Sequence, residues 1–310
     1  MMGKGQEKWI GIAWIMKNRY PVVLTILMLI LTSFIGYTGS RVMEDFGRND
    51  IETESRSQLD TTASHVGDNL IQVDNAVEVM AKSTDLRSAL TSDNETFIDQ
   101  ANVILDTYRY TFEVSVCYLM NGTGITIASS NRNDPSSFVG KDYSFRPYFT
   151  EAIRGIRERY YALGVTSGVR GYYSSYPVRA ENGTIIGVAV IKQELDFLEQ
   201  DLRQEGYTFL VSPDEVIFIS GTDGLINHTL GRLNAETRLE LETSRQFGEG
   251  PFEPFTHEPV ETGDEVEIDG TTYLVSRKTI NDDGWSVVTF RSLRGSEYFL
   301  WLGYLITLLV

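Results

Sequence analysis

The chain has 310 residues, of which 42% are hydrophobic and 11% aromatic, so it is long and apolar enough to bury a packed core. Its formal net charge of −16 argues against a nucleic acid as a partner, because an acidic surface repels phosphate. A single cysteine, Cys117, excludes an intrachain disulfide and a thiolate metal cluster. The histidines His65, His228 and His257 lie far apart without ligand spacing, so the sequence predicts no metal site, no cofactor and no catalytic residue.

An uncharged segment near the N-terminus predicts a membrane-spanning helix. Residues 1–19 are basic, and residues 20–39 carry no charge. This length crosses a bilayer core as a helix, and the basic flank favours a cytoplasmic N-terminus. A cleaved signal peptide is the alternative, but the apolar run is long for one and Arg41-Val-Met-Glu is a poor cleavage site. We therefore expect an uncleaved anchor.

The chain turns apolar again at its far end. From Tyr298 to Val310 it carries no charge, but this segment is too short to cross a bilayer. We expect residues 297–310 to be the start of a second transmembrane helix. Residues 40–296 would then form an extracytoplasmic domain of a cell-membrane protein.

An apolar stripe follows the first span. Its residues recur four and three positions apart, which places them on one face of a helix: Leu59, Ala63, Val66, Leu70, Val73, Val77 and Met80. We expect a long stalk helix over residues 40–91 that continues from the membrane span. The stripe fits packing within its own domain and parallel homodimerisation equally well. A second helix is predicted to begin with Asp93 or Asn94 as its N-cap.

Beyond these helices the pattern changes to the period of two that is typical of strands. Segments 113–120 and 125–129 flank Asn-Gly-Thr-Gly, which is a strong hairpin signal. Further strands are predicted over 159–165, 172–179 and 184–192, and a helix over 194–204.

A second, similar cycle begins at Gly206, with predicted strands over 207–211, 216–220, 266–268, 272–278 and 285–291. The similarity lies in the order of elements and not in residue identity. The sequence therefore predicts an α+β fold, in which a long N-terminal helix carries two tandem antiparallel-sheet modules, residues 92–205 and 206–296.

The segment Ser137 to Phe149 places five aromatic residues around one arginine, Arg146. A planar guanidinium suits a carboxylate, and aromatic walls lower the local dielectric constant and strengthen the pairing. This predicts a pocket for a small carboxylate. The alternative is a structural arginine whose donors are satisfied by backbone carbonyls.

The order of these features resembles the double-Cache sensor domain, a tandem PAS-like extracellular domain of bacterial and archaeal receptors. Four segments look like the membrane-distal module of C4-dicarboxylate sensor histidine kinases of the DctB type: Gly140–Phe149, Ala162–Gly168, Gly171–Tyr173 and Gly187–Lys192. Tyr273-Leu-Val-Ser-Arg and Gly284-Trp285 look like the membrane-proximal module of that family. The resemblance implies a receptor that binds a small ligand in its distal module and signals through its transmembrane helices.

The resemblance also implies a ligand site made of Tyr143, Arg146, Thr166, Ser167, Gly168, Tyr173 and Lys192. Arg146 would hold one carboxylate and Lys192 a second, while residues 166–168 would donate hydroxyl and backbone N–H groups. Two separated cations across an aromatic cleft select a short dianion.

Lys192 favours a carboxylate without an amino group over an amino acid. Amino-acid-binding members of the family use acidic residues to hold the ligand's ammonium, one of them at the strand position of Lys192, where a lysine would repel an amine. The alternative is that Lys192 pairs at the surface with Glu194 or Asp196.

The leading hypothesis is the sensor region of a two-component histidine kinase. A chemoreceptor or another Cache receptor for an amino acid or a monocarboxylate is one alternative. A membrane-anchored surface enzyme that acts on small acids is an alternative of another class, and an orphan domain with an empty pocket is a third.

Overall fold

The computed structural model describes residues 19–92, 94–203, 206–294, 301 and 305. The predicted cytoplasmic segment up to residue 18 lies outside the described residues, as does the predicted second span apart from Trp301 and Leu305. The chain divides into two compact units: Met1–Arg56 with Glu265–Leu274 and Arg291–Val310, and Ser57–Asp264 with Val275–Phe290.

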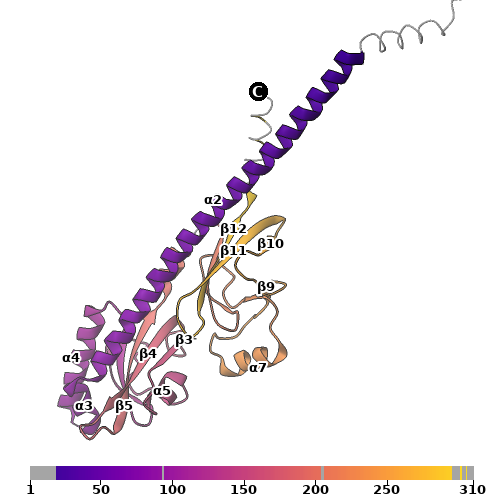
Figure 1. Cartoon of the computed structure of the whole chain (residues 1–310). Coiled ribbons are helices and arrows are strands. Elements are labelled where there is room, and N and C mark those ends of the chain that lie inside the picture. The colour runs from indigo at the N-terminus through magenta and orange to yellow at the C-terminus, as the bar shows by residue number, and fades with distance from the viewer. Residues whose placement is uncertain (1–18, 93, 204–205, 295–300, 302–304, 306–310) are drawn as a thin grey trace, which may run out of the picture. The chain divides into compact units, whose positions relative to one another are not determined.

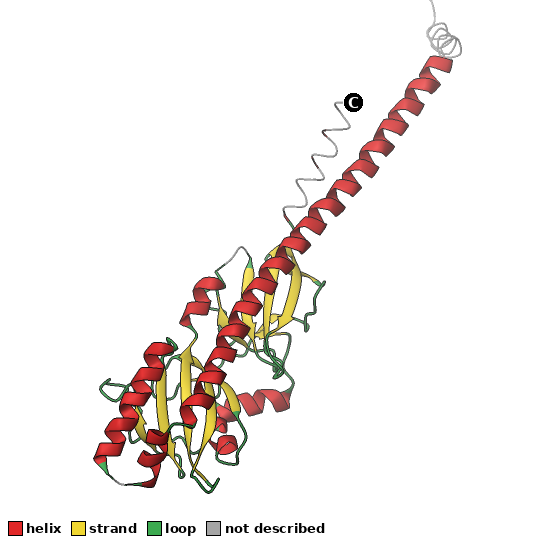
Figure 2. Ribbon diagram, turned by 60° about the vertical axis from the view of Figure 1, so that its left-hand side comes forward, coloured by secondary structure: helices red, strands yellow, loops and turns green. Residues whose placement is uncertain are grey.

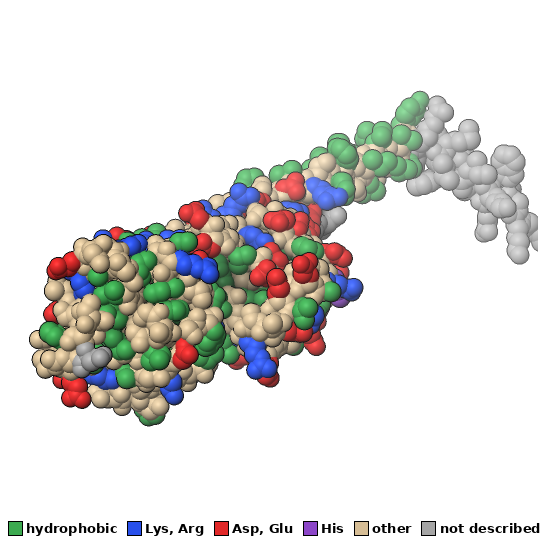
Figure 3. Space-filling view, turned by 90° about the horizontal axis from the view of Figure 1, so that it is seen from below, with side chains coloured by type: hydrophobic (Ala, Val, Ile, Leu, Met, Phe, Trp, Pro, Cys, Tyr) green, Lys and Arg blue, Asp and Glu red, His purple; other side chains and the backbone are tan. Residues whose placement is uncertain are grey.

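Helix α2 is continuous from Arg19 to Ala81 (Figure 1). Its first part, residues 20–39, is uncharged, and Figure 3 shows this end of the helix covered with hydrophobic side chains. Among the described residues, α2 is the one helix that is long and apolar enough to cross a membrane. The predicted apolar segment and the outer helix therefore form one element.

The helix that we predicted over residues 40–91 is interrupted after Ala81, and this part of the prediction is wrong. Ser83 is extended, and its hydroxyl accepts a hydrogen bond from the backbone N–H of Asp85, so it caps a separate helix α3, Thr84–Thr91. The apolar pattern hides this break because α3 also buries residues, Leu86 and Ala89.

Helix α4, Glu95–Thr111, begins where the sequence predicted. The side chain of Asn94 accepts a hydrogen bond from the backbone N–H of Thr96 and serves as the N-cap. The buried residues of this helix include Ala101 and Leu105.

The apolar stripe of α2 is buried within its own domain. Each of its seven residues is at most 5% exposed, and all belong to a core that includes Leu105 of α4 and Leu119 of the first sheet. Ile71 and Val79 are 55% and 57% exposed. The structure therefore uses the stripe for intradomain packing, which leaves only other faces of α2 for contacts with a second chain.

The first sheet has five strands in the order β2-β1-β5-β4-β3: β1 Val116–Asn121, β2 Thr126–Ser129, β3 Glu158–Leu163, β4 Arg170–Arg179 and β5 Ile185–Glu194. All of its neighbouring strands are antiparallel, and β1 and β2 form the predicted hairpin. Residues of α2, α3 and α4 share a core with one face of the sheet, and Figure 2 shows these helices against the strands. The other face packs against helix α5, Pro147–Ala152, and the segment that precedes it.

The second sheet repeats this topology. Its strands are β6 Tyr207–Val211, β7 Ile217–Ser220, β10 Glu265–Ile268, β11 Thr271–Thr279 and β12 Ser286–Ser292, in the order β10-β11-β12-β6-β7. When the strands are numbered in chain order within each sheet, both sheets have the order 2-1-5-4-3. The predicted α+β fold with two tandem antiparallel sheets is confirmed.

Three smaller elements accompany the sheets. Helix α6, Asp196–Asp201, follows β5, and helix α7, Ala235–Ser244, lies between β7 and β10 in the chain. The short parallel pair β8, Thr229–Leu230, and β9, Pro254–Thr256, was not predicted, since two and three residues are too few to show a period.

Candidate ligand site

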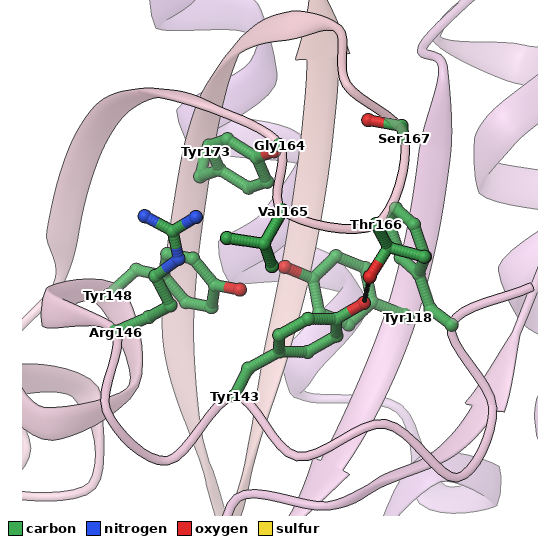
Figure 4. A pocket seen from close by; sticks show the side chains of 10 residues that line it. Tyr118, Tyr143, Arg146, Tyr148, Gly164, Val165, Thr166, Ser167 and Tyr173 are labelled. Atoms are coloured by element: carbon green, nitrogen blue, oxygen red, sulfur yellow. Dashed lines mark hydrogen bonds between the residues drawn. The ribbon is translucent and has the colours of Figure 1, made fainter. Parts of the chain in front are cut away.

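A cavity lies on the face of the first sheet that is opposite to α2. Its lining consists of Tyr118, Phe138, Tyr143, Arg146, Tyr148, Gly164, Val165, Thr166, Ser167 and Tyr173 (Figure 4). The structure thus brings together five of the seven predicted site residues. Arg146 is the one charged side chain in this lining.

Strand alternation decides which tyrosines reach this cavity. Tyr172 and Tyr173 are neighbours on β4, so their side chains point to opposite faces of the sheet. Tyr172 belongs to the core that contains α2, whereas Tyr173 belongs to the core around the cavity and stacks on Tyr148, with ring centroids 5.2 Å apart. Tyr161 and Tyr160 on β3 divide in the same way.

Arg146 occupies the N-cap position of α5, directly before Pro147. A proline disfavours the helical conformation of the preceding residue, and Arg146 is accordingly extended, with φ −78° and ψ 138°. The side chain turns inward and is 5% exposed, with the guanidinium over the rings of Phe145 and Tyr160 at 5.4 and 5.7 Å.

The guanidinium of Arg146 is only partly satisfied. It donates one hydrogen bond, of 3.1 Å, to the carbonyl of Leu163, and it has no ion-pair partner within the part of the chain that the structure describes. A guanidinium has five N–H donors, and a buried charge is costly without a counterion. A backbone carbonyl therefore satisfies only one of the guanidinium donors. The other donors and the positive charge suit an anion.

The loop between β3 and β4 closes over the cavity. The hydroxyls of Tyr143 and Thr166 are hydrogen bonded at 2.7 Å (Figure 4). Gly164 is required here, because a Cβ at this position would lie 2.4 Å from the hydroxyl oxygen of Ser167. Closure of the cavity therefore depends on contacts within this loop and with Tyr143.

Gly168 does not belong to the cavity wall. Its backbone N–H donates to the carbonyl of Gly164 at 2.8 Å, so it is not available to a ligand in this conformation. The residue has φ +67°, which lets the loop turn back toward β4. The part of the Gly168 N–H in ligand binding therefore stays a prediction, and it requires this hydrogen bond to open.

Lys192 lies directly behind the wall. Its side chain is fully buried on the cavity face of β5, in cross-strand register with Tyr173, and its ammonium donates to the hydroxyl of Ser167 at 2.9 Å. The same ammonium pairs with Glu194 at 2.7 Å. The alternative partner that we considered is thus present, but the lysine is buried and not at the surface.

Five lining residues were not among the seven predicted site residues, although Phe138 and Tyr148 belong to the aromatic segment around Arg146: Tyr118, Phe138, Tyr148, Gly164 and Val165. Tyr118 is the most informative, because its hydroxyl is buried and lacks a hydrogen-bond partner among the described residues. Burial, with a further contribution from the Tyr148 hydroxyl, raises the pKa of Tyr118 well above its usual value, so it remains a neutral donor. Alternation along β1 could have placed Tyr118 on the cavity face from the sequence, because Cys117 and Leu119 face α2 and Tyr118 must face away.

The cavity is small. The centre of a water-sized sphere can occupy only about 10 Å³ of it. This is room for about one water molecule. A four-carbon ligand is larger than this space, so the cavity must widen before such a ligand can bind.

The described lining of the cavity contains no carboxylate. Among all residues that the structure describes, no group of three or more His, Cys, Asp or Glu side chains is placed to hold a metal ion.

The two tandem antiparallel sheets behind a long helix define the class of this chain: a family model for the Cache domain matches residues 47–294. The chain belongs to the Cache domain family. Within this family it is similar to the C4-dicarboxylate transport sensor protein DctB of Rhizobium meliloti (strain 1021), with 33% identity over 184 residues, which are 59% of this chain and 30% of that protein. DctB of Pseudomonas aeruginosa is 26% identical over 277 residues, 89% of this chain and 43% of that protein.

The chain spans less than half the length of these curated relatives. Among solved structures, the sensor domain of the Vibrio cholerae histidine kinase DctB superimposes with a TM-score of 0.70 and 28% identity, covering 79% of this chain and 98% of that chain. The ligand-binding domain of the Campylobacter jejuni chemoreceptor Tlp3, in complex with L-valine, has a TM-score of 0.57, 16% identity and coverages of 83% and 98%, which shows a shared fold alone. The chain is thus a Cache sensor domain similar to those of DctB-type sensor kinases.

Proposed function

We propose that this chain is the ligand-sensing region of a membrane-bound two-component histidine kinase, and that its cavity binds a small carboxylate of the C4-dicarboxylate class. The observation that carries the proposal is the guanidinium of Arg146, which is buried among aromatic rings without an acidic partner in the described chain. The names of the DctB relatives support the ligand class.

The charges around the cavity favour a ligand without an amino group. An amino acid needs an anionic group for its ammonium, and the lining contains no carboxylate. The carboxylate of Glu194, beyond the wall, is already paired with Lys192. A ligand ammonium would therefore be buried without a counterion, at a large cost in binding free energy.

The path of the signal would begin at β4. Tyr173 lines the cavity, and the adjacent Tyr172 donates a hydrogen bond of 2.5 Å to Asp74 of α2. A ligand that moves β4 would therefore bias the position of the helix that leads to the apolar segment. The same proposal includes a second transmembrane helix, a kinase effector and a homodimer that forms through faces of α2 other than its stripe. A chemoreceptor effector is the alternative, since the fold is shared with Tlp3.

A thermal unfolding screen of the chain in detergent micelles tests the ligand class. We expect succinate, malate or fumarate to raise the Tm, because a ligand at about 100 times its Kd stabilises the folded state by roughly 2.7 kcal/mol. Amino acids at the same concentration and ionic strength serve as the comparison. A response to amino acids alone would contradict the proposal, as would recovery of a chemically converted acid, which would indicate an enzyme.

Tyr143→Phe removes a hydroxyl from the cavity lining. This hydroxyl is bonded to Thr166 in the free protein and would donate to the ligand in the complex, so the loss of that contact should cost about 1 kcal/mol and weaken ligand binding by roughly fivefold. Isothermal titration calorimetry with the ligand identified above measures the change. Tyr110→Phe is the matched control, because Tyr110 is 75% exposed and lies outside the lining. Equal effects of the two substitutions would show that the Tyr143 hydroxyl has no part in binding.

A further inference from the structure

Strand β5 supplies both charges of the ion pair behind the cavity wall, and β4 leaves space for it. Lys192 and Glu194 are two positions apart on β5, so their side chains lie on the same face of the sheet. Gly171 on β4 provides the space for the lysine, since a Cβ there would lie 2.9 Å from its Cε. The Lys192 side chain is completely buried, whereas that of Glu194 is 33% exposed.

The charges at this site do not yet suit a dianion. Arg146 contributes one positive charge to the cavity, and the pair of Lys192 and Glu194 is neutral as a whole. The site as it stands therefore balances one carboxylate. The second carboxylate of a dianion would need the Lys192 ammonium, which is one hydrogen bond away through Ser167.

Glu194 has room to leave the lysine. It lines a second, more open cavity together with Arg109 and Asn131, and Ser167 and Phe138 belong to the walls of both cavities. A small rotation of the partly exposed glutamate into this second cavity would free the ammonium, and Arg109 there offers a cation.

We propose that Glu194 is an internal counterion that holds Lys192 in the free protein, and that a dicarboxylate binds by displacing the Glu194 carboxylate from the ammonium. Glu194 is then the residue that sets the selectivity between dicarboxylates and monocarboxylates. This inference rests on the proposed function and deepens it, because it explains how a site with one unpaired cation accepts a dianion.

The test compares succinate with butyrate, which has the same four-carbon chain and one carboxylate fewer. Glu194→Gln should lower the Kd of succinate by roughly fivefold. This factor corresponds to about 1 kcal/mol, the upper end of what an ion pair exposed to solvent contributes. The Kd of butyrate should change less than about twofold, since butyrate does not need Lys192. Calorimetry on the whole chain in micelles, at constant ionic strength, gives both values, and Glu181→Gln in an exposed turn is the matched control.

A double-mutant cycle shows whether Glu194 acts through Lys192. In a Lys192→Met background, Glu194→Gln should leave the Kd of succinate unchanged, because the competition for the ammonium is gone. If Glu194→Gln does not fold, Glu194→Asp gives the same test, since its side chain is one methylene shorter and its carboxylate lies farther from the ammonium.

The outcomes separate this inference from the proposed function. If the unaltered chain binds succinate and Glu194→Gln binds it equally or more weakly, the counterion role is wrong and the carboxylate site stands. A gain that persists in the Lys192→Met background also overturns it. If the unaltered chain binds neither succinate nor butyrate, the proposed function fails and the counterion role fails with it.

Discussion

Arg146→Met should lower the affinity for the carboxylate ligand by about 10- to 150-fold, because a charge-assisted hydrogen bond is worth roughly 1.5 to 3 kcal/mol. The methionine fills much of the space of the arginine side chain but offers no donor. Arg154→Met is the matched control, since Arg154 follows α5 and is 68% exposed, with Glu151 as its partner. Calorimetric titration of both variants measures the difference.

The same substitution should leave the ligand-free protein equally stable or make it more stable. A buried cation without a counterion is a cost to folding, and replacing such a charge by an apolar side chain is often neutral or stabilising. The guanidinium makes one hydrogen bond, to Leu163, which limits what is lost. A variant with a markedly lower Tm and unchanged ligand affinity would show that Arg146 is a structural residue.

Asp74→Ala should destabilise the fold by about 3 to 5 kcal/mol, the cost of breaking a buried charge pair on one side. Asp74 of α2 is 3% exposed and pairs with Arg159 of β3 at 2.6 Å. It also accepts hydrogen bonds from the hydroxyls of Tyr172 and Ser174, at 2.5 and 2.6 Å. Alanine would leave both buried hydroxyls without this acceptor, and Arg159 would keep only the longer contact with Asp283, at 3.8 Å.

Asp60→Ala on the same helix is the control for Asp74→Ala. Asp60 is 62% exposed and pairs with Lys278, which is 52% exposed, so its loss should cost less than about 1 kcal/mol. Urea unfolding followed by circular dichroism measures both variants. Similar losses for the two would mean that the Asp74 cluster does not hold α2 to the sheet.

The local features of this protein could be read from the sequence. Strands showed their period of two, the Asn-Gly turn marked the first hairpin, and Asn94 marked the start of α4. Tyr143 and Arg146 could be assigned to one cavity because they lie within a few residues of each other beside a proline. Periods and caps are properties of neighbouring residues, so they need no knowledge of the fold.

Other features depend on which segments of the folded chain pack against a given face. The spacing of the α2 stripe predicts an apolar face, but only the packed core shows that this face is covered by the chain's own sheet. Alternation assigns Tyr118 to a face of β1, but the cavity on that face comes from Arg146 and Thr166, which arrive from other segments.

The charges of the site also show which features the sequence determines and which the tertiary structure decides. The sequence determined by itself that Arg146 and Lys192 lie in segments of one sheet module. The resemblance to the Cache family predicted that both bind the same ligand. The tertiary structure decided that Arg146 has no counterion among the described residues, while Lys192 is paired with Glu194. The physical reason is that pairing of charges depends on distance and burial across strands, whereas sequence patterns report only which face of an element a side chain occupies.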